Sequence, residues 1–303
     1  MMITEDFKPQ LTADGSFTFF SAEEGETFHS IKGAREESLM KFVEPTLLRQ
    51  KAQQPSLQLL DVCYGLGYNT AAALATIWEV NPNCRVELVG LELNSDVPKA
   101  ALDHHLLNTW PQPIPELLAE LAKTHAISAN CLRATLLIGD ARSTIELVPF
   151  QADGIFLDPF SPPKCPQLWT VEFIDVIARC LKPDGRLATY SCAAAVRTAL
   201  MAAGLQIGST PPVGRRSPST VASFSATSLP PLSIQEQEHL LCRAAIPYRD
   251  PHRRDDAATI LHRRLIEQKA SALEPTSHWK KRWLACYNLE NTETGSNRLH
   301  RRR

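Results

Sequence analysis

Several features that would classify this 303-residue chain at once are missing from it. No apolar run approaches the ~18–20 residues that a membrane-spanning helix requires, and the first residues are too polar for a secretory signal peptide. The eight cysteines include no Cys-x-x-Cys pair and no histidine at zinc-finger spacing. These absences predict a reduced, cytoplasmic protein without a membrane or metal partner, whose cysteines act as small hydrophobic side chains.

Charge is present but unevenly placed. The chain is 44% hydrophobic and 21% charged, an ordinary composition for a globular protein with one sizeable core. Residues 243–303 contain 14 Lys and Arg against 7 Asp and Glu, a net charge of +7, whereas residues 1–242 carry −8. A basic appendage of this kind is typical of nucleic-acid contact, and equally of a solvated helix face with a disordered end. The sequence leaves both interpretations open.

The stretch around Gly65 and Gly67 has the clearest local pattern. Residues 57–63 are typical of a short buried strand, the two glycines of a tight turn, and residues 70–78 of a helix. Glycine lets the backbone turn tightly and approach a ligand with no side chain between them. This order opens a doubly wound α/β domain that binds a nucleotide-like ligand at its first turn.

Strands and helices alternate after this turn. We predict strands at residues 57–63, 86–93, 134–138, 154–157 and 186–190, an antiparallel pair at 205–209 and 219–224, and helices across 95–131. The fold class is therefore α/β and Rossmann-like, with a mostly parallel seven-stranded sheet and an antiparallel last strand. Residues 1–56 are expected to form an N-terminal extension or cap, with a helix over 35–50 that Pro45 breaks. Residues 57–226 would form the α/β domain, and 227–303 a basic tail with helices and a disordered end.

Four predicted strands in succession end in an acid: Asp61, Glu92, Asp140 and Asp158. The carboxyl ends of parallel strands meet at one edge of the sheet, where ligands of open α/β folds bind. Glu92 lies 25 positions after Gly67, close to the spacing at which an acid accepts hydrogen bonds from ribose hydroxyls. Asp140 suits an adenine amino group, and Asp61 suits a ligand whose tail is cationic.

This acid pattern distinguishes between two cofactors. A dinucleotide requires backbone N–H groups and no carboxylate beside its phosphates. S-adenosylmethionine carries a sulfonium and an ammonium group, which favour acids nearby. The third glycine of the dinucleotide fingerprint is also absent, because Asn69 and Thr70 follow Gly67. The sequence therefore favours S-adenosylmethionine, with NAD as the alternative.

The motif Asp158-Pro159-Phe160 closes the fourth strand. In methyltransferases that act on amines, an Asp or Asn before Pro and an aromatic residue holds the nucleophile by its hydrogens. Positioning supplies most of the catalysis in such a displacement, and only a neutral amine has a lone pair to attack with. Asp158 would orient that amine; the alternative is that Asp158 and Pro159 merely form a turn.

Residues 161–169 are too rich in proline to form a helix. We expect a rigid lip over the site, with Lys164 reaching a phosphate and Trp169 packing under the loop. Arg215 and Arg216, in the turn between the last two strands, would reach the substrate only if they lie at the same end of the sheet. The alternative is that both arginines are solvated.

Four segments resemble the MnmC-like methyltransferase domain, and they are residues 25–37, 63–69, 158–170 and 182–191. The similarity covers about residues 10–225, and the loop after the fourth strand is its most specific part. The resemblance implies an S-adenosylmethionine-dependent methyltransferase that acts on the wobble uridine of tRNA. It would convert 5-aminomethyl-2-thiouridine into 5-methylaminomethyl-2-thiouridine.

The resemblance also implies roles for individual residues. The family's catalytic aspartate falls on Asp158, followed here by Pro159 and Phe160. The candidate cofactor-binding residues are Asp61, Gly65, Gly67, Asn69, Glu92 and Asp140, and the candidate substrate-binding residues are Glu26, His29, Lys164, Arg215 and Arg216. The family usually has Asp-Gly-Phe and Lys-Asn-Pro where this chain has Asp158-Pro159-Phe160 and Lys164-Cys165-Pro166.

Bifunctional members of the family carry a flavin-dependent oxidase domain. This chain is too short to contain one, and no Gly-x-Gly-x-x-Gly motif follows Ser225, so we expect no FAD and no oxidase step. The expected partner is tRNA, with another tRNA-modifying enzyme supplying the aminomethyl group. Two alternatives remain. The same fold and cofactor would serve a small-molecule or protein amine, which the acidic core favours. A non-catalytic protein that binds S-adenosylmethionine or tRNA is disfavoured by the intact Asp158 motif.

Overall fold

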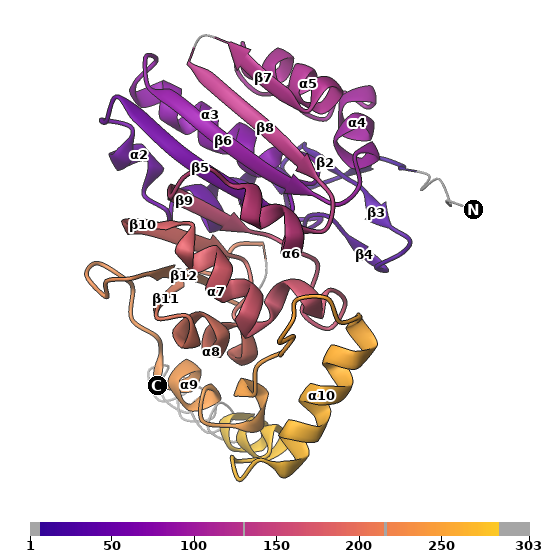
Figure 1. Cartoon of the computed structure of the whole chain (residues 1–303), viewed down its shortest axis with the longest axis vertical. Coiled ribbons are helices and arrows are strands. Elements are labelled where there is room, and N and C mark those ends of the chain that lie inside the picture. The colour runs from indigo at the N-terminus through magenta and orange to yellow at the C-terminus, as the bar shows by residue number, and fades with distance from the viewer. Residues whose placement is uncertain (1–6, 130, 215–216, 285–303) are drawn as a thin grey trace, which may run out of the picture.

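The computed structural model describes residues 7–129, 131–214 and 217–284, and an eight-stranded sheet runs through its centre (Figure 1). The strands lie in the order β11-β12-β10-β9-β5-β6-β8-β7, with β10, β9, β5, β6 and β8 parallel and with β7 and β12 antiparallel to their neighbours. Their bounds are β5 Ser56–Val62, β6 Arg85–Glu92, β7 Ala126–Ala129, β8 Leu132–Ile138, β9 Ala152–Leu157, β10 Leu181–Thr189, β11 Gln206–Thr210 and β12 Ser219–Ser223.

Helices cover both faces of this sheet. The helices are α3 Tyr68–Val80, α4 Asp96–Asp103, α5 Ile114–Thr124, α6 Ala141–Thr144, α7 Val171–Arg179 and α8 Ala194–Ala202, with short 3₁₀ turns η2 Ile145–Leu147 and η3 Pro166–Trp169. Side chains alternate between the faces of a strand. Accordingly, Leu59 joins the core with α3 and α5, and Leu60 joins the core with α7 and α8.

The predicted fold class is confirmed, with one more strand than expected. Residues 126–129 were expected to be helical, but they form β7, which pairs antiparallel with β8 at the edge of the sheet. The pair β11 and β12 is antiparallel, as predicted. The parallel strands bring their carboxyl ends to one edge, so the acids that follow them come to the same side of the molecule.

The N-terminal segment folds over that edge. It forms two small hairpins, β1 Gln10–Leu11 with β2 Phe17–Thr18 and β3 Phe20–Ser21 with β4 Glu26–Thr27. The expected helix over 35–50 is divided into α1 Ala34–Ser38, the π-helical turn η1 Leu39–Val43 and α2 Leu48–Lys51. The break falls after Pro45, where Leu47 has a left-handed backbone with φ 59°.

The C-terminal segment packs below α7 and α8 in Figure 1. It contains α9 Ile234–His239, η4 Arg243–Ala245, α10 Ala257–Ala270 and a helical stretch at residues 276–284. The backbone N–H of Val171, the first residue of α7, donates to the carbonyl of Tyr248 in this segment at 3.1 Å, an ordinary hydrogen-bond distance. In the described part of the chain, no helix is both long enough and apolar enough to cross a membrane.

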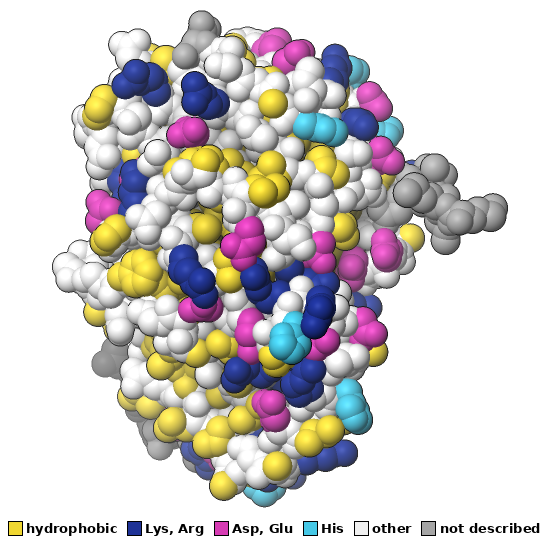
Figure 2. Space-filling view, viewed as in Figure 1, with side chains coloured by type: hydrophobic (Ala, Val, Ile, Leu, Met, Phe, Trp, Pro, Cys, Tyr) yellow, Lys and Arg dark blue, Asp and Glu magenta, His cyan; other side chains and the backbone are white. Residues whose placement is uncertain are grey.

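Much of the positive charge of this segment is used inside the protein. Arg249 pairs with Glu172 at 2.7 Å, and Arg264 donates to the carbonyl of Ile246 at 2.6 Å. Figure 2 shows Lys and Arg side chains interspersed with Asp and Glu on this face rather than gathered in one basic patch. Arg215, Arg216 and residues 291–303, for which we made predictions, lie outside the described residues.

Candidate functional site

A cavity of about 450 Å³ opens at the carboxyl ends of β5, β6 and β9. Its walls come from the loops after these strands, from the hairpin of β3 and β4, and from α1. The lining residues used below are Glu23, Glu24, Glu26, Phe28, His29, Glu37, Tyr64, Gly65, Glu92, Asp158, Phe160 and Tyr190. The structure thus gathers at one cavity residues that lie more than a hundred positions apart in the sequence.

The turn after β5 forms the first wall. Gly65 and Gly67 have φ values of 56° and 83°, in the left-handed region that favours glycine. A Cβ atom at Gly67 would lie 2.7 Å from the hydroxyl oxygen of Tyr64, so no larger residue fits there. Gly65 lines the cavity, whereas Gly67 supports the turn and precedes α3.

Glu92, the last residue of β6, faces the cavity from the next strand. Its carboxylate accepts hydrogen bonds from the backbone N–H of Gly65 at 2.8 Å and of Asn94 at 2.9 Å. Burial raises the pKa of Glu92. The two backbone donors hold the carboxylate in one orientation, which prepares it to accept further hydrogen bonds.

Asp158 follows β9 and lines the same cavity, where its side chain is partly buried. Burial, followed by the negative charge of Glu37, raises the pKa of Asp158 well above its usual range. The side-chain amide of Asn69 donates to Asp158 at 2.9 Å. Asn69, predicted as a cofactor-binding residue, therefore contacts the candidate catalytic aspartate and does not itself line the cavity.

Asp61 lies apart from these residues. It is fully buried in β5 and is not among the residues that line the cavity. The Thr70 hydroxyl donates to it at 2.8 Å, and its other carboxylate oxygen has no partner among the described residues. Burial raises the pKa of Asp61 to about 8. Asp61 is therefore not exposed to the cavity, and its contact with a cationic ligand stays a prediction.

The loop after Asp158 is held in place from both sides. Glu26 of β4 accepts hydrogen bonds from the hydroxyl of Ser161 at 2.6 Å and from its backbone N–H at 3.1 Å. The buried indole of Trp169 donates to the carbonyl of Phe160 at 2.9 Å. The hydroxyl of Tyr190 donates to the carbonyl of Pro159, also at 2.9 Å. These hydrogen bonds fix the position of the loop, with Trp169 packed under it as expected.

Of the predicted substrate-binding residues, Glu26 holds this loop and Lys164 belongs to it. Glu26 lines the cavity, but its carboxylate is engaged by Ser161. Lys164 does not line the cavity; a Cβ atom at Gly25 would lie 3.6 Å from its Nζ atom, which places that ammonium beside the turn between β3 and β4. Phe28 and Phe160 meet edge to face across this boundary, with ring centroids 5.2 Å apart.

A polar group from the N-terminal segment completes the site. His29 is 7% exposed and lines the cavity, and its Nδ1 atom has no partner among the described residues. Burial lowers the pKa of His29 to about 4, so the imidazole is neutral. Glu37 and Lys41 form an ion pair that is almost wholly buried. Sequence reasoning missed Glu37 and Lys41, although Glu37 lies in a segment that resembles the family.

Asp140 caps α6 after β8 and is not among the residues that line the cavity. Its carboxylate accepts from the guanidinium of Arg142, with Nη2 at 2.7 Å. Burial opposes ionisation, but the hydrogen bonds from Arg142 outweigh it and lower the pKa of Asp140. In the described part of the chain, no group of three His, Cys, Asp or Glu is arranged to hold a metal ion.

Comparison with known proteins agrees with this geometry. Residues 102–225 match a family model described as S-adenosyl-L-methionine-dependent methyltransferase. The crystal structure of MnmC2 from Aquifex aeolicus superposes with a TM-score of 0.78 and 36% identity, covering 88% of this chain and 86% of that one. An uncharacterized protein of Methanocaldococcus jannaschii, MJ0670, is 28% identical over 249 residues, 79% of this chain and 66% of that protein.

Curated bifunctional relatives are much longer. The tRNA 5-methylaminomethyl-2-thiouridine biosynthesis bifunctional protein MnmC of Ralstonia nicotianae is 31% identical over 231 residues, which cover 71% of this chain and 34% of that protein. The chain therefore spans about a third of the length of this relative. Taken with the fold and the cavity, the similarity to MnmC2 shows that the chain belongs to the MnmC-like family of S-adenosylmethionine-dependent methyltransferases.

Proposed function

We propose that the protein methylates the aminomethyl group on the wobble uridine of tRNA, converting 5-aminomethyl-2-thiouridine into 5-methylaminomethyl-2-thiouridine. The observation that carries this proposal is the partly buried carboxyl of Asp158, which lines one cavity with Glu92 and Gly65 and has a raised pKa. The similarity to MnmC2 over most of both chains supports it. So does the name of the bifunctional relatives, which assigns them to 5-methylaminomethyl-2-thiouridine biosynthesis in tRNA.

The cavity suits S-adenosylmethionine in size and in the groups around it. A volume of about 450 Å³ is in the range of small-molecule sites. The oriented carboxylate of Glu92 would accept hydrogen bonds from the ribose hydroxyls, and Gly65 would allow a close approach of the backbone.

Asp158 would act on the acceptor amine. When bound, S-adenosylmethionine supplies an electrophilic methyl group beside a positive charge. Asp158 would hold the amine by its hydrogens, so that the lone pair points at the methyl carbon. An alkylammonium has a pKa near ~10 and must lose a proton to react. A carboxylate whose pKa is raised takes up that proton more readily than an ordinary aspartate.

A small-molecule or protein amine is the second candidate acceptor. Glu23 and Glu24 line the cavity together with Glu26 and Glu37, and the described lining residues include no Lys or Arg. An acidic lining attracts a free cationic amine and repels phosphate. For tRNA as the acceptor, we propose instead that basic groups outside the cavity, such as Lys164, contact the phosphates.

Nucleoside mass spectrometry tests the acceptor. Purified protein is given methyl-labelled S-adenosylmethionine and tRNA from cells that lack the protein, and parallel reactions contain protein or metabolite extracts. Label in the wobble nucleoside is expected, with 5-aminomethyl-2-thiouridine consumed in proportion. Label confined to another extract would replace the acceptor, and cofactor binding without turnover in any reaction would indicate a non-catalytic binding protein. We propose that a separate tRNA-modifying enzyme supplies the 5-aminomethyl group.

A further inference from the structure

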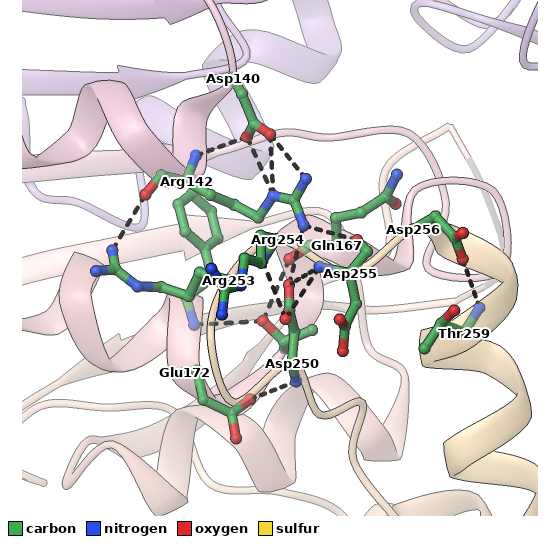
Figure 3. Close-up of polar contacts among 12 residues, drawn as sticks. Asp140, Arg142, Gln167, Glu172, Asp250, Arg253, Arg254, Asp255, Asp256 and Thr259 are labelled. Carbon is green, nitrogen blue, oxygen red and sulfur yellow. Dashed lines mark hydrogen bonds and ion pairs between the residues drawn. The ribbon is translucent and has the colours of Figure 1, made fainter.

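Arg142 links the loop after β8 to the C-terminal segment (Figure 3). On one side, its Nε and Nη2 atoms donate to the carboxylate of Asp140 at 3.1 and 2.7 Å. On the other side, its Nη1 atom donates to the Asp250 carboxylate at 2.9 Å and to the Asp255 carbonyl at 2.8 Å. Only 12% of the Arg142 side chain is exposed. The guanidinium thus fixes the position of one acid with respect to another 110 residues further along the chain.

The C-terminal end of this link is rigidly anchored. Asp250 is fully buried and accepts the backbone N–H groups of Arg254 at 3.1 Å and of Asp255 at 3.2 Å. Its own N–H donates to Glu172 of α7 at 2.8 Å. Asp250 is thus held by the loop that contains Arg254 and Asp255 and by Glu172 in the first turn of α7, and it holds Arg142 against both.

The Asp140 end of the link faces the cofactor side of the sheet. Residue 138 pairs with Glu92 in the register of β8 and β6, and the N–H of Gly139 donates to the carbonyl of Glu92 at 2.8 Å. Asp140 therefore follows directly on the strand end beside the ribose-binding candidate. Its side chain is 43% exposed although Arg142 holds both of its oxygens. Three donors of Arg142, its backbone N–H, Nε and Nη2, already contact this carboxylate, which has about four lone-pair sites and so keeps about one acceptor position for a ligand.

We propose that Arg142 is a positioning residue for the cofactor's adenine: it holds Asp140 where the carboxylate accepts the adenine 6-amino group, and Asp250 holds Arg142. This inference rests on the proposed S-adenosylmethionine site and on the adenine contact predicted from the sequence for Asp140, which lies outside the lining of the cavity. It makes the C-terminal segment a structural part of the cofactor site, although none of its residues lines the cavity. A guanidinium suits this role because its planar donors fix a carboxylate in two directions at once, which a lysine ammonium cannot do.

Two ligands separate positioning from general support. One is S-adenosylhomocysteine, and the other is its analogue with hydrogen in place of the adenine 6-amino group. The unmodified protein is expected to bind the first about tenfold more tightly, the usual order for one hydrogen bond to a charged group. Arg142→Gln is expected to weaken S-adenosylhomocysteine about tenfold and the analogue less than about twofold. Isothermal titration calorimetry on the full chain measures both affinities.

The control is Arg249→Gln. Arg249 belongs to the same segment and pairs with Glu172, but it does not contact Arg142 or Asp140. This variant is expected to keep the tenfold preference. If Arg142→Gln fails to fold, Arg142→Lys takes its place, and a reduced preference for the amino group is again expected. Equal weakening of both ligands, or an unmodified protein that does not distinguish them, would overturn the proposal.

The binding experiment contains no methyl acceptor. Its outcome therefore does not depend on whether the acceptor is tRNA, and a wrong acceptor would appear only in the nucleoside analysis. In a transfer assay, Arg142→Gln should raise KM for S-adenosylmethionine about tenfold and act much less on kcat. A fall in kcat at unchanged KM would also contradict the positioning role.

Discussion

Two parallel strands that end at the same edge of the sheet are each followed by an aspartate, and the surroundings of the two carboxyls act on them in opposite ways. Asp158, after β9, is partly buried near the negative Glu37 with a neutral amide as its hydrogen-bond donor, and its pKa is raised. Asp140, after β8, is 43% exposed and held by Arg142, and its pKa is lowered. Among the described residues, no cation forms an ion pair with Asp158, whereas Asp140 is paired with Arg142.

The difference assigns different roles to two residues that look alike in the sequence. A buried carboxyl without a cation gains most when a cationic ligand enters, and it can also hold a proton. A carboxylate paired with arginine stays ionised and keeps its orientation, which suits a fixed hydrogen bond. Titratable groups whose environments move their pKa values apart often divide the work of a site in this way. Asp158 is therefore our candidate for chemistry and Asp140 for recognition.

The largest expected effect separates the two acids by kinetics. Asp158→Asn keeps the shape of the side chain but removes the charge that holds the amine, so kcat should fall about a thousandfold, within the usual range for such groups. Its affinity for S-adenosylhomocysteine should change less than about threefold. Asp140→Asn should instead lower kcat/KM about tenfold, through KM for S-adenosylmethionine. Steady-state methyl transfer and calorimetry measure both, and similar profiles for the two variants would remove the distinction.

A tenfold effect is expected when the hydrogen bonds between Glu26 and the loop after Asp158 are removed. Glu26→Ala removes the acceptor of both hydrogen bonds from Ser161, so the loop and Asp158 should lose their fixed position. We expect kcat/KM for the methyl acceptor to fall about tenfold, measured with varied acceptor at saturating cofactor. The matched control is Glu36→Ala, an exposed glutamate of the same N-terminal segment. An unchanged kcat/KM for the methyl acceptor in Glu26→Ala would mean that the loop holds its position without the hydrogen bonds to Glu26.

The strand-end acids could be predicted because they depend on local pattern. An apolar run of strand length followed by Glu92 or Asp158 places the acid at the carboxyl edge wherever the strand lies in a parallel sheet. The strand β7 could not be found in the same way. Its four residues follow α5 directly, and only Ile127 favours a strand, so pairing with β8 rather than propensity decides its structure.

Long-range charge pairing was beyond the sequence. Lys41 follows Glu37 by four residues, a spacing that normally marks a solvated helix face, yet the pair is buried against the cavity. Arg142 and Asp250 are 108 residues apart, and no local pattern connects them. The count of basic residues from position 243 onward likewise left two interpretations open, a surface for nucleic acid or a solvated helix face, and did not show that arginines such as Arg249 and Arg264 make contacts within the fold.

The smallest expected effect is on stability, and the comparison predicts its sign. An acid whose pKa is raised in the folded protein binds its proton more tightly there than when unfolded, so its contribution to stability falls as pH rises above the unfolded value of 3.8. An acid whose pKa is lowered contributes stability above that value and loses it as pH falls. At neutral pH, Asp158→Asn should therefore stabilise the protein, and Asp140→Asn should destabilise it.

Urea unfolding between pH 4 and 8 measures this difference directly. The gain from Asp158→Asn should shrink toward pH 4, where the unfolded chain also carries a protonated carboxyl at that position. The loss from Asp140→Asn should stay below about 1 kcal/mol, because its ion pair with Arg142 is partly exposed to solvent. If both variants destabilise the protein at pH 8, Asp158 has a cation partner in the folded chain that offsets its burial. The two aspartates would then differ in position but not in electrostatic environment, and Asp158 would no longer be our candidate for the group that takes up the amine proton.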